Sequence, residues 1–324
     1  MEGLAEMSNQ ATLGRSVHAI GIGVHSGQKV RIALRPAEEN TGVVFVRVDC
    51  DAVVHARAAL VSDTTLATTV ADNGVKVVTI EHLMAALSGM AIDNARVELT
   101  GEELPALDGS SAPFVELIRA AGRKRQAAPR TYLKVTKSVS VEKDGARASL
   151  HPFSGFAAQY TFVADHPVYN QFPKHVALDF SEAEFARDLS FARSFGLVEE
   201  LPAAQKLGRC LGSSLENAVG IDAQGILNAD GLRCEDEFAR HKLLDAIGDL
   251  YLLGYPLLGR FVGFKSGHAL NNQLIRLLLD SNDAYELVPA PEVLVAADLA
   301  GNSGHRFQIA PAISDRAVTP LQTS

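Results

Sequence analysis

The sequence predicts an α+β protein built from two domains of similar topology, each a β-sheet with two main helices. At 324 residues the chain exceeds the usual size of a single hydrophobic core. Its first third alternates short β-forming runs with turns and then changes to helix, strand and helix. The same order recurs after residue 128, which indicates a duplication. We expect domains at residues 1–128 and 129–285, followed by a C-terminal tail at 286–324.

In the first domain the expected strands and helices are bounded by turn and capping residues. In order they are the strands VRIALRP (30–36), GVVFVRVD (42–49) and VKVVTI (75–80), the helix IEHLMAALS (80–88), the strand DNARVEL (93–99) and the helix SAPFVELIRAAG (111–122). Asn73-Gly74 is typical of a hairpin turn. Thr79 is expected to cap the first helix, and Ser111 begins the second. We take the basic stretch GRKRQAAPR (122–130) as the domain boundary.

The second domain repeats this order and adds an insertion. Its expected elements are the strands YLKVTKSVSVE (132–142), ARASLHP (146–152) and AAQYTFV (157–163), the helix DEFARHKLLDAIGDLYLLG (236–254), the strand RFVGFK (260–265) and the helix GHALNNQLIRLLL (267–279). The insertion runs from about residue 166 to 232 and contains a short helix with Ser181 and Glu184 spaced as a capping box. Insertions of this length usually shape a binding site.

Composition and charge exclude several classes of function. The 47% hydrophobic and 21% charged residues are typical of a soluble protein, and the net charge of −8 argues against non-specific nucleic-acid binding. The three cysteines form no CxxC pair, which favours reduced thiols over disulfides or a thiolate metal site. The amino terminus is not a secretory signal, and no apolar run reaches the ~20 residues of a transmembrane segment. We therefore expect a cytoplasmic protein.

One predicted helix carries a stripe of potential metal ligands. His241, Asp245 and Asp249 lie four residues apart, so they share one face, with Lys242 beside them. A solvated face of an amphipathic helix is the alternative explanation. Against it, the stripe uses short Asp and His where a solvated face usually carries Glu, Lys and Arg, and Asp245 has poor helix propensity.

Two further histidines complete the candidate site. His82 follows Glu81 in the first turn of a helix whose same face carries small residues, which would let a second helix with Gly248 approach closely. A satisfied core histidine is the alternative for His82. His268 follows a strand, where it is either a catalytic histidine held by Asp249 or only a helix cap.

If these groups converge, they fit a metal-dependent hydrolase. Two histidines and one aspartate, His82, His241 and Asp245, supply the three protein ligands of a catalytic zinc. Glu81 and His268 would then serve proton transfer during cleavage of an amide or ester. His25, in the glycine-rich turn GIGVHSG, is a weaker ligand candidate.

With these motifs the chain resembles the UDP-3-O-acyl-N-acetylglucosamine deacetylases, which carry out the committed step of lipid A synthesis in Gram-negative bacteria. The motifs that carry the resemblance are GIGVHSGQKV, DTTLATT, TIEHLMAAL, DGSSAPFVELI, ARSFG, LGSSLENA, GLRCEDEFARHKLLDAIGDLYLLG and KSGHALNNQL, between residues 15 and 279. The resemblance implies helices sandwiched between the two sheets, an active site at the domain junction, and a hydrophobic acyl passage formed by the insertion.

The resemblance also implies roles for individual residues. His82, His241 and Asp245 look like the zinc ligands, and Glu81 like the general base that activates water. His268 looks like the general acid that protonates the leaving amine, oriented by Asp249.

Four more positions are implied around the substrate. Lys242 would hold the oxyanion or the substrate, and Lys265 resembles a residue that meets the diphosphate of the nucleotide. Ser194 stands where the family usually has threonine, and its hydroxyl can still donate to the oxyanion. Phe195 is expected against the sugar or the acyl group.

The expected reaction is removal of the N-acetyl group from an acylated UDP-amino sugar. We expect a monomeric enzyme that uses Zn²⁺, although Fe²⁺ accepts the same ligands. One alternative is a related metal amidase or esterase that acts on another acylated sugar nucleotide. Another, from a different class, is a non-catalytic sugar-nucleotide or envelope-regulatory binding protein with the same fold.

Overall fold

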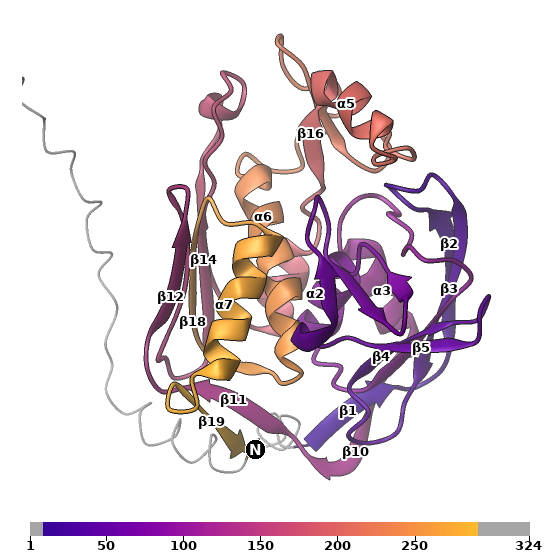
Figure 1. Cartoon of the computed structure of the whole chain (residues 1–324), viewed down its shortest axis with the longest axis vertical. Helices are drawn as coiled ribbons and strands as arrows, with labels where there is room; N and C mark the ends of the chain where they lie inside the picture. Colours follow the sequence, from indigo (N-terminus) through magenta and orange to yellow (C-terminus); the bar gives the residue numbers. More distant parts are fainter. Residues whose placement is uncertain (1–8, 291–324) are drawn as a thin grey trace, which may run out of the picture.

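The computed structural model describes residues 9–290 and has four main helices packed between two β-sheets (Figure 1). This arrangement confirms the predicted α+β class and the sandwich of helices between sheets. The first eight residues and residues 291–324, which include most of the expected tail, lie outside the described part. Within residues 9–290, none of the helices is long and apolar enough to span a bilayer.

The first sheet has five strands, and all its neighbouring pairs are antiparallel except β4 and β9, which are parallel. Its spatial order is β2 (Val17–Ile22), β3 (Lys29–Pro36), β9 (Ala95–Leu99), β4 (Val43–Arg47) and β5 (Ala52–His55). Helices α2 (Glu81–Gly89) and α3 (Ala112–Ala121) cover its inner face (Figure 1). A small antiparallel sheet of β6 (Val61–Asp63), β7 (Thr69–Asp72) and β8 (Val75–Val77) precedes α2, and the predicted Asn73-Gly74 turn joins β7 to β8 with positive φ angles.

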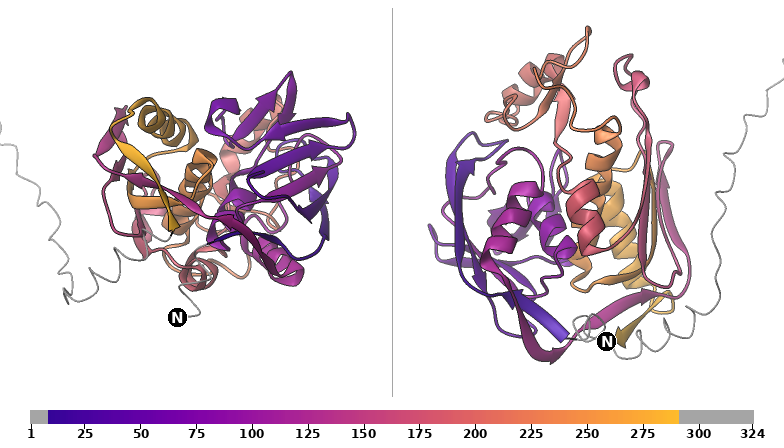
Figure 2. Two further views of the ribbon diagram at one scale, coloured as in Figure 1. Left: turned by 90° about the horizontal axis from the view of Figure 1, so that it is seen from below. Right: turned by 180° about the vertical axis from the view of Figure 1, so that it is seen from behind.

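The second sheet has seven strands arranged around β18 (Leu257–Phe264). The others are β11 (Thr131–Val135), β12 (Val139–Lys143), β13 (Ala146–His151), β14 (Phe156–Thr161), β15 (His175–Asp179) and β19 (Tyr285–Pro289). β18 pairs antiparallel with β13 on one side and parallel with β14 on the other. Helices α6 (Glu237–Leu250) and α7 (His268–Asp280) lie on its inner face, and the view from behind shows the same order of layers (Figure 2).

Helices α2 and α6 cross closely at the centre of the sandwich because one glycine lies at the contact. A Cβ added to Gly248 would come within 2.2 Å of the carbonyl oxygen of Glu81, so no larger residue fits without movement. The expected close approach of the two helices is therefore confirmed. Gly89, at the other end of α2, is covered in the same way by the ring of Phe185.

The insertion only partly forms a separate structure. Strand β15 joins the second sheet, whereas β16 (Phe195–Leu197) and β17 (Val219–Ile221) pair with each other in parallel. Helix α4 (Glu182–Glu184), the π-turn η3 (Phe185–Leu189) and helix α5 (Leu201–Lys206) complete it, and β16 and α5 project at one end of the molecule (Figure 1). As predicted, the Ser181 hydroxyl caps α4 by accepting the N–H of Glu184.

The local prediction of a cap for α2 is wrong. Thr79 does not cap this helix, because its hydroxyl donates instead to the Glu103 carboxylate at 3.0 Å. At the start of the expected tail, β19 pairs antiparallel with β11.

The expected boundary stretch forms a strand of its own. Residues Arg123–Pro129 make up β10, which pairs with β1 (Asn9–Leu13) before the chain enters β11. The division of the chain at residue 128 stays a prediction.

Candidate active site

Three helix segments bring the predicted site residues together. Glu81 and His82 occupy the first turn of α2, and the stripe of α6 faces them across the Gly248 contact. His268 is the first residue of α7. The stripe is not a solvated face, because His241, Asp245 and Asp249 are only 3%, 4% and 2% exposed.

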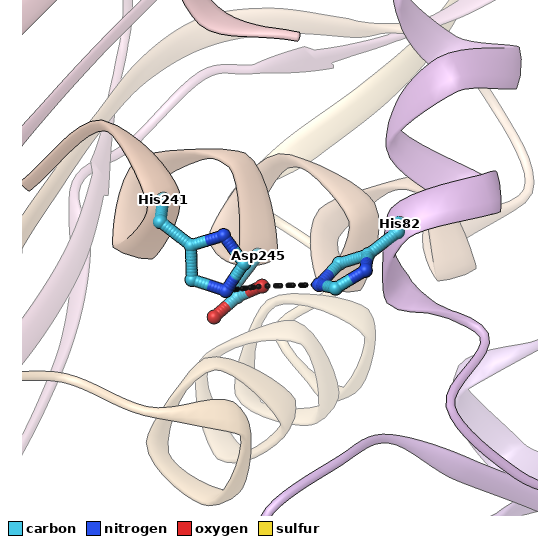
Figure 3. Close-up of side chains that lie close together, drawn as sticks. All are labelled: His82, His241 and Asp245. Atoms are coloured by element: carbon cyan, nitrogen blue, oxygen red, sulfur yellow. Dashed lines mark ion pairs between the residues drawn. The ribbon is translucent and has the colours of Figure 1, made fainter. Parts of the chain in front are cut away.

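The candidate metal ligands form a compact buried group. One nitrogen each of His82 and His241 and one carboxylate oxygen of Asp245 all lie within 4.8 Å of one another. Both imidazole Nε2 atoms are 3.5 Å from the same oxygen, Asp245 Oδ1 (Figure 3). Donor atoms at these separations can surround one divalent cation at the ~2.0–2.2 Å typical of zinc.

The chemistry of the donor set fits a cation. Asp245 Oδ1 is buried and accepts no hydrogen bond from the described residues, which is costly for a carboxylate oxygen unless a cation compensates it. The Nδ1 of His241 lies 3.0 Å from the carbonyl oxygen of Ala192, so that ring donates there and turns an unprotonated Nε2 toward Asp245. Burial lowers the pKa of His241 to about 3, which keeps the ring neutral as a metal ligand requires.

Glu81 lies beside this group as a buried carboxylate. Its Oε2 accepts the backbone N–H of Thr68 at 3.0 Å. Burial raises the pKa of Glu81 above its ordinary value, although His268 and His82 oppose the shift. A carboxylate whose proton affinity is increased in this way is suited to accept a proton near neutral pH.

His268 and Asp249 form a second buried pair beside the group. The Nδ1 of His268 lies 3.0 Å from Asp249 Oδ2, and its Nε2 points toward Asp245, 4.0 Å from Oδ2. Burial alone would lower the pKa of His268, but the charge and hydrogen bond of Asp249 raise it to about 9. The ring is therefore a protonated donor at neutral pH.

Of the four other predicted positions, three line the same cavity as the candidate ligands. Lys242 donates to Asp245 Oδ2 at 2.5 Å, and Asp245 raises the pKa of that lysine against the effect of burial. Ser194 and Phe195 also line the cavity, and the Phe195 ring lies 5.8 Å from that of His241. Lys265 is exposed at the end of β18, has φ +53°, and is not among the residues that line the cavity.

A buried ion pair fixes the segment with Ser194 and Phe195 to α6. Glu237 is fully buried, and its carboxylate accepts both the backbone N–H and the guanidinium of Arg193, at 3.0 and 2.8 Å. Since Ala192 is the neighbouring residue, the same ion pair also holds the carbonyl that orients His241.

The cavity has a volume of about 520 Å³ and is lined both by the buried polar group and by a set of apolar side chains, here called the apolar channel. The insertion supplies the channel side chains Phe195, Val198, Leu201, Leu215 and Leu227. The lining offers charged groups and hydrocarbon within one cavity, so it can accept a ligand with a polar head and an apolar chain.

Sequence reasoning missed residues that hold the site together. Thr68 contacts both Glu81 and Asp249, and Asn271 donates to Asp249 Oδ2 at 2.9 Å. Asn271 lies three residues after His268 on the same helix, a spacing that could have indicated it. His25, the weaker ligand candidate, is buried in the cavity wall away from the ligand group, and its Nδ1 accepts the N–H of Cys210.

Comparison with known proteins agrees with this geometry. The profile of the family described as UDP-3-O-acyl N-acetylglycosamine deacetylase matches residues 10–280. A UDP-3-O-acyl-N-acetylglucosamine deacetylase from Pseudomonas entomophila (strain L48) is 48% identical over 284 residues, which cover 87% of this chain and 94% of that protein. With a site built from these residues, and with matches that span nearly all described elements, the chain belongs to the UDP-3-O-acyl-N-acetylglycosamine deacetylase family.

Proposed function

We propose that this deacetylase removes the N-acetyl group of UDP-3-O-acyl-N-acetylglucosamine in the cavity between α2, α6 and α7, releasing acetate and the free amine. In lipid A synthesis this is the committed step. The observation that carries the proposal is the convergence of three ligand atoms, within 4.8 Å of one another, beside a buried carboxylate and a histidine–aspartate pair. These are the groups that amide hydrolysis requires.

The cation is proposed to be Zn²⁺, held by His82, His241 and Asp245, and Fe²⁺ accepts the same ligands. When bound, it would polarise the acetamide carbonyl and lower the pKa of the attacking water. The unpartnered Asp245 Oδ1 and the neutral His241 ring support this assignment.

The remaining groups divide the proton transfers between them. Glu81 accepts a proton from the attacking water, and His268, oriented by Asp249, donates one to the departing nitrogen. Lys242 and Ser194 donate to the oxygen on which negative charge develops, and such donors are often the largest single contribution to catalysis.

The apolar channel supports an acylated substrate. Its leucine, valine and phenylalanine side chains offer hydrocarbon contacts to a fatty chain, and the Phe195 ring lies 5.8 Å from that of His241. Lys265 is proposed to contact the nucleotide diphosphate from outside the cavity. The monomeric state and the cytoplasmic location stay predictions, and the first is supported by a site formed wholly within one chain.

The test measures acetate release from the acylated UDP-sugar together with metal content. Glu81→Gln should retain about one metal ion per chain and lose most turnover, and His268→Ala should lose roughly a hundredfold or more. Near-normal turnover of Glu81→Gln would refute its role as the base.

A second comparison distinguishes the proposed deacetylase from the related amidase or esterase. It uses the same UDP-sugar with and without the 3-O-acyl chain. Equal hydrolysis of the two would favour the alternative enzyme, and absence of stoichiometric metal would favour the non-catalytic binding protein.

A further inference from the structure

Thr68 contacts both halves of the proposed acid–base machinery. It lies between β6 and β7, on the first-domain side of the junction, and is only 2% exposed. Its backbone N–H donates to Glu81 Oε2 at 3.0 Å, and its hydroxyl donates to Asp249 Oδ1 at 2.6 Å. Thr68 and Asp249 are 181 residues apart in the sequence, so this hydroxyl joins the two domains.

Within the described part of the chain, the Asp249 carboxylate has three hydrogen-bonding partners from two segments, the loop before β7 and helix α7. Besides the Thr68 hydroxyl, these are the Nδ2 of Asn271 at 2.9 Å and the Nδ1 of His268 at 3.0 Å. Asp249 is buried, so the direction of its two oxygens depends on these donors and not on water. Removing the Thr68 hydroxyl leaves Asn271 as the one other donor among the described residues that fixes the carboxylate against the imidazole.

The backbone of Thr68 also fixes the start of α2. Its carbonyl oxygen accepts the N–H of Ile80 at 3.3 Å, and its own N–H holds the Glu81 carboxylate. The short segment around Thr68 thus sets the position of the base relative to the His268–Asp249 pair, although the two groups come from different domains.

We infer that Thr68 is a positioning residue for the deacetylation reaction. Its hydroxyl holds Asp249, which in turn orients His268, and its backbone N–H holds Glu81, so one residue fixes the proposed acid and the proposed base relative to each other. The inference rests on the proposed roles of Glu81, His268 and Asp249. Thr68 does not line the cavity, so it acts through these side chains and not on the substrate.

The test compares Thr68→Val with Thr68→Ser. Valine keeps the shape and the backbone N–H to Glu81 but lacks the hydroxyl, whereas serine keeps the hydroxyl. Because a hydrogen bond to a charged group is removed, Thr68→Val should lower kcat by roughly 10- to 100-fold, with KM changed less than about threefold. Thr68→Ser should remain within about threefold of the natural protein.

Thr69→Val is the matched control. Thr69 is the neighbouring threonine and is equally buried, at 2% exposed, but it is not the residue that contacts Asp249. Its substitution should leave kcat almost unchanged. Metal content of about one ion per chain in all variants would show that the loss does not come from the metal centre.

A double-variant comparison tests the same inference if valine also lowers thermal stability. When His268→Ala is already present, adding Thr68→Val should reduce kcat less than about twofold, because both changes act on one unit. The inference is overturned if Thr68→Val is as active as the natural protein, if serine fails to restore activity, or if the two losses multiply. If His268→Ala itself is fully active, the proposed function fails first, and that result is distinct.

Discussion

Gly248→Ala is expected to disrupt the contact on which the candidate site depends. The added Cβ would lie 2.2 Å from the Glu81 carbonyl oxygen and 3.0 Å from its carbonyl carbon. Restoring ordinary van der Waals contact requires α2 and α6 to separate by roughly 1 Å. In an unobstructed helix, replacing glycine by alanine would raise the free energy of unfolding by up to about 1 kcal/mol. A decrease in the free energy of unfolding would therefore identify the clash.

We expect a net loss of about 1–3 kcal/mol in the free energy of unfolding, the usual cost of overpacking. Activity should fall further, by about a hundredfold, because the displacement moves Glu81 and His82 away from the α6 ligands. Urea unfolding and acetate release measure the two effects. Gly101→Ala is the control, since its Cβ would meet Val30 at an ordinary 3.8 Å. A Gly248→Ala protein as stable and active as the natural one would refute this account of helix contact.

Three further outcomes are expected. His268 has a pKa of about 9, so the rate of acetate release should fall tenfold per pH unit above that value. The stability that its protonated ring contributes is fully present below pH 6.5 and should be lost as pH rises through about 9. A rate independent of pH up to 10 would contradict its role as the acid. Arg130→Ala should lower the free energy of unfolding by about 3–5 kcal/mol, because it leaves the Asp93 carboxylate, whose side chain is only 12% exposed, without the guanidinium that lies 2.6 Å away. A loss below about 1 kcal/mol in urea unfolding would contradict this. Asp245→Ala should reduce bound metal well below one ion per chain and abolish turnover, as removal of the ion by a chelator should do reversibly; full metal content in the variant would exclude Asp245 as a ligand.

The helical stripe shows what could be predicted from the sequence. The spacing of His241, Asp245 and Asp249 puts them on one face whatever surrounds the helix, and Gly248 indicated close packing against a partner. Their burial could not be derived from the spacing, because a solvated stripe has the same period. The resemblance to a family resolved this where periodicity could not.

Contacts between distant segments explain which features could not be predicted from local sequence patterns. Thr79 has the sequence context of a helix cap, yet its hydroxyl donates to Glu103, which a local pattern cannot reveal. Thr68 acts through a partner 181 residues away. Strand β19 falls at the start of the expected tail, and its pairing with β11 depends on the completed sheet.

The division of the ligand group between two helices has a thermodynamic consequence. His82 comes from α2, whereas His241 and Asp245 come from α6, so an ion that binds all three also fastens one helix to the other. By linkage, free ion at about 100 times its dissociation constant adds about 2.7 kcal/mol to the folded state. Metal supply would thus govern how long the protein survives as well as how fast it works.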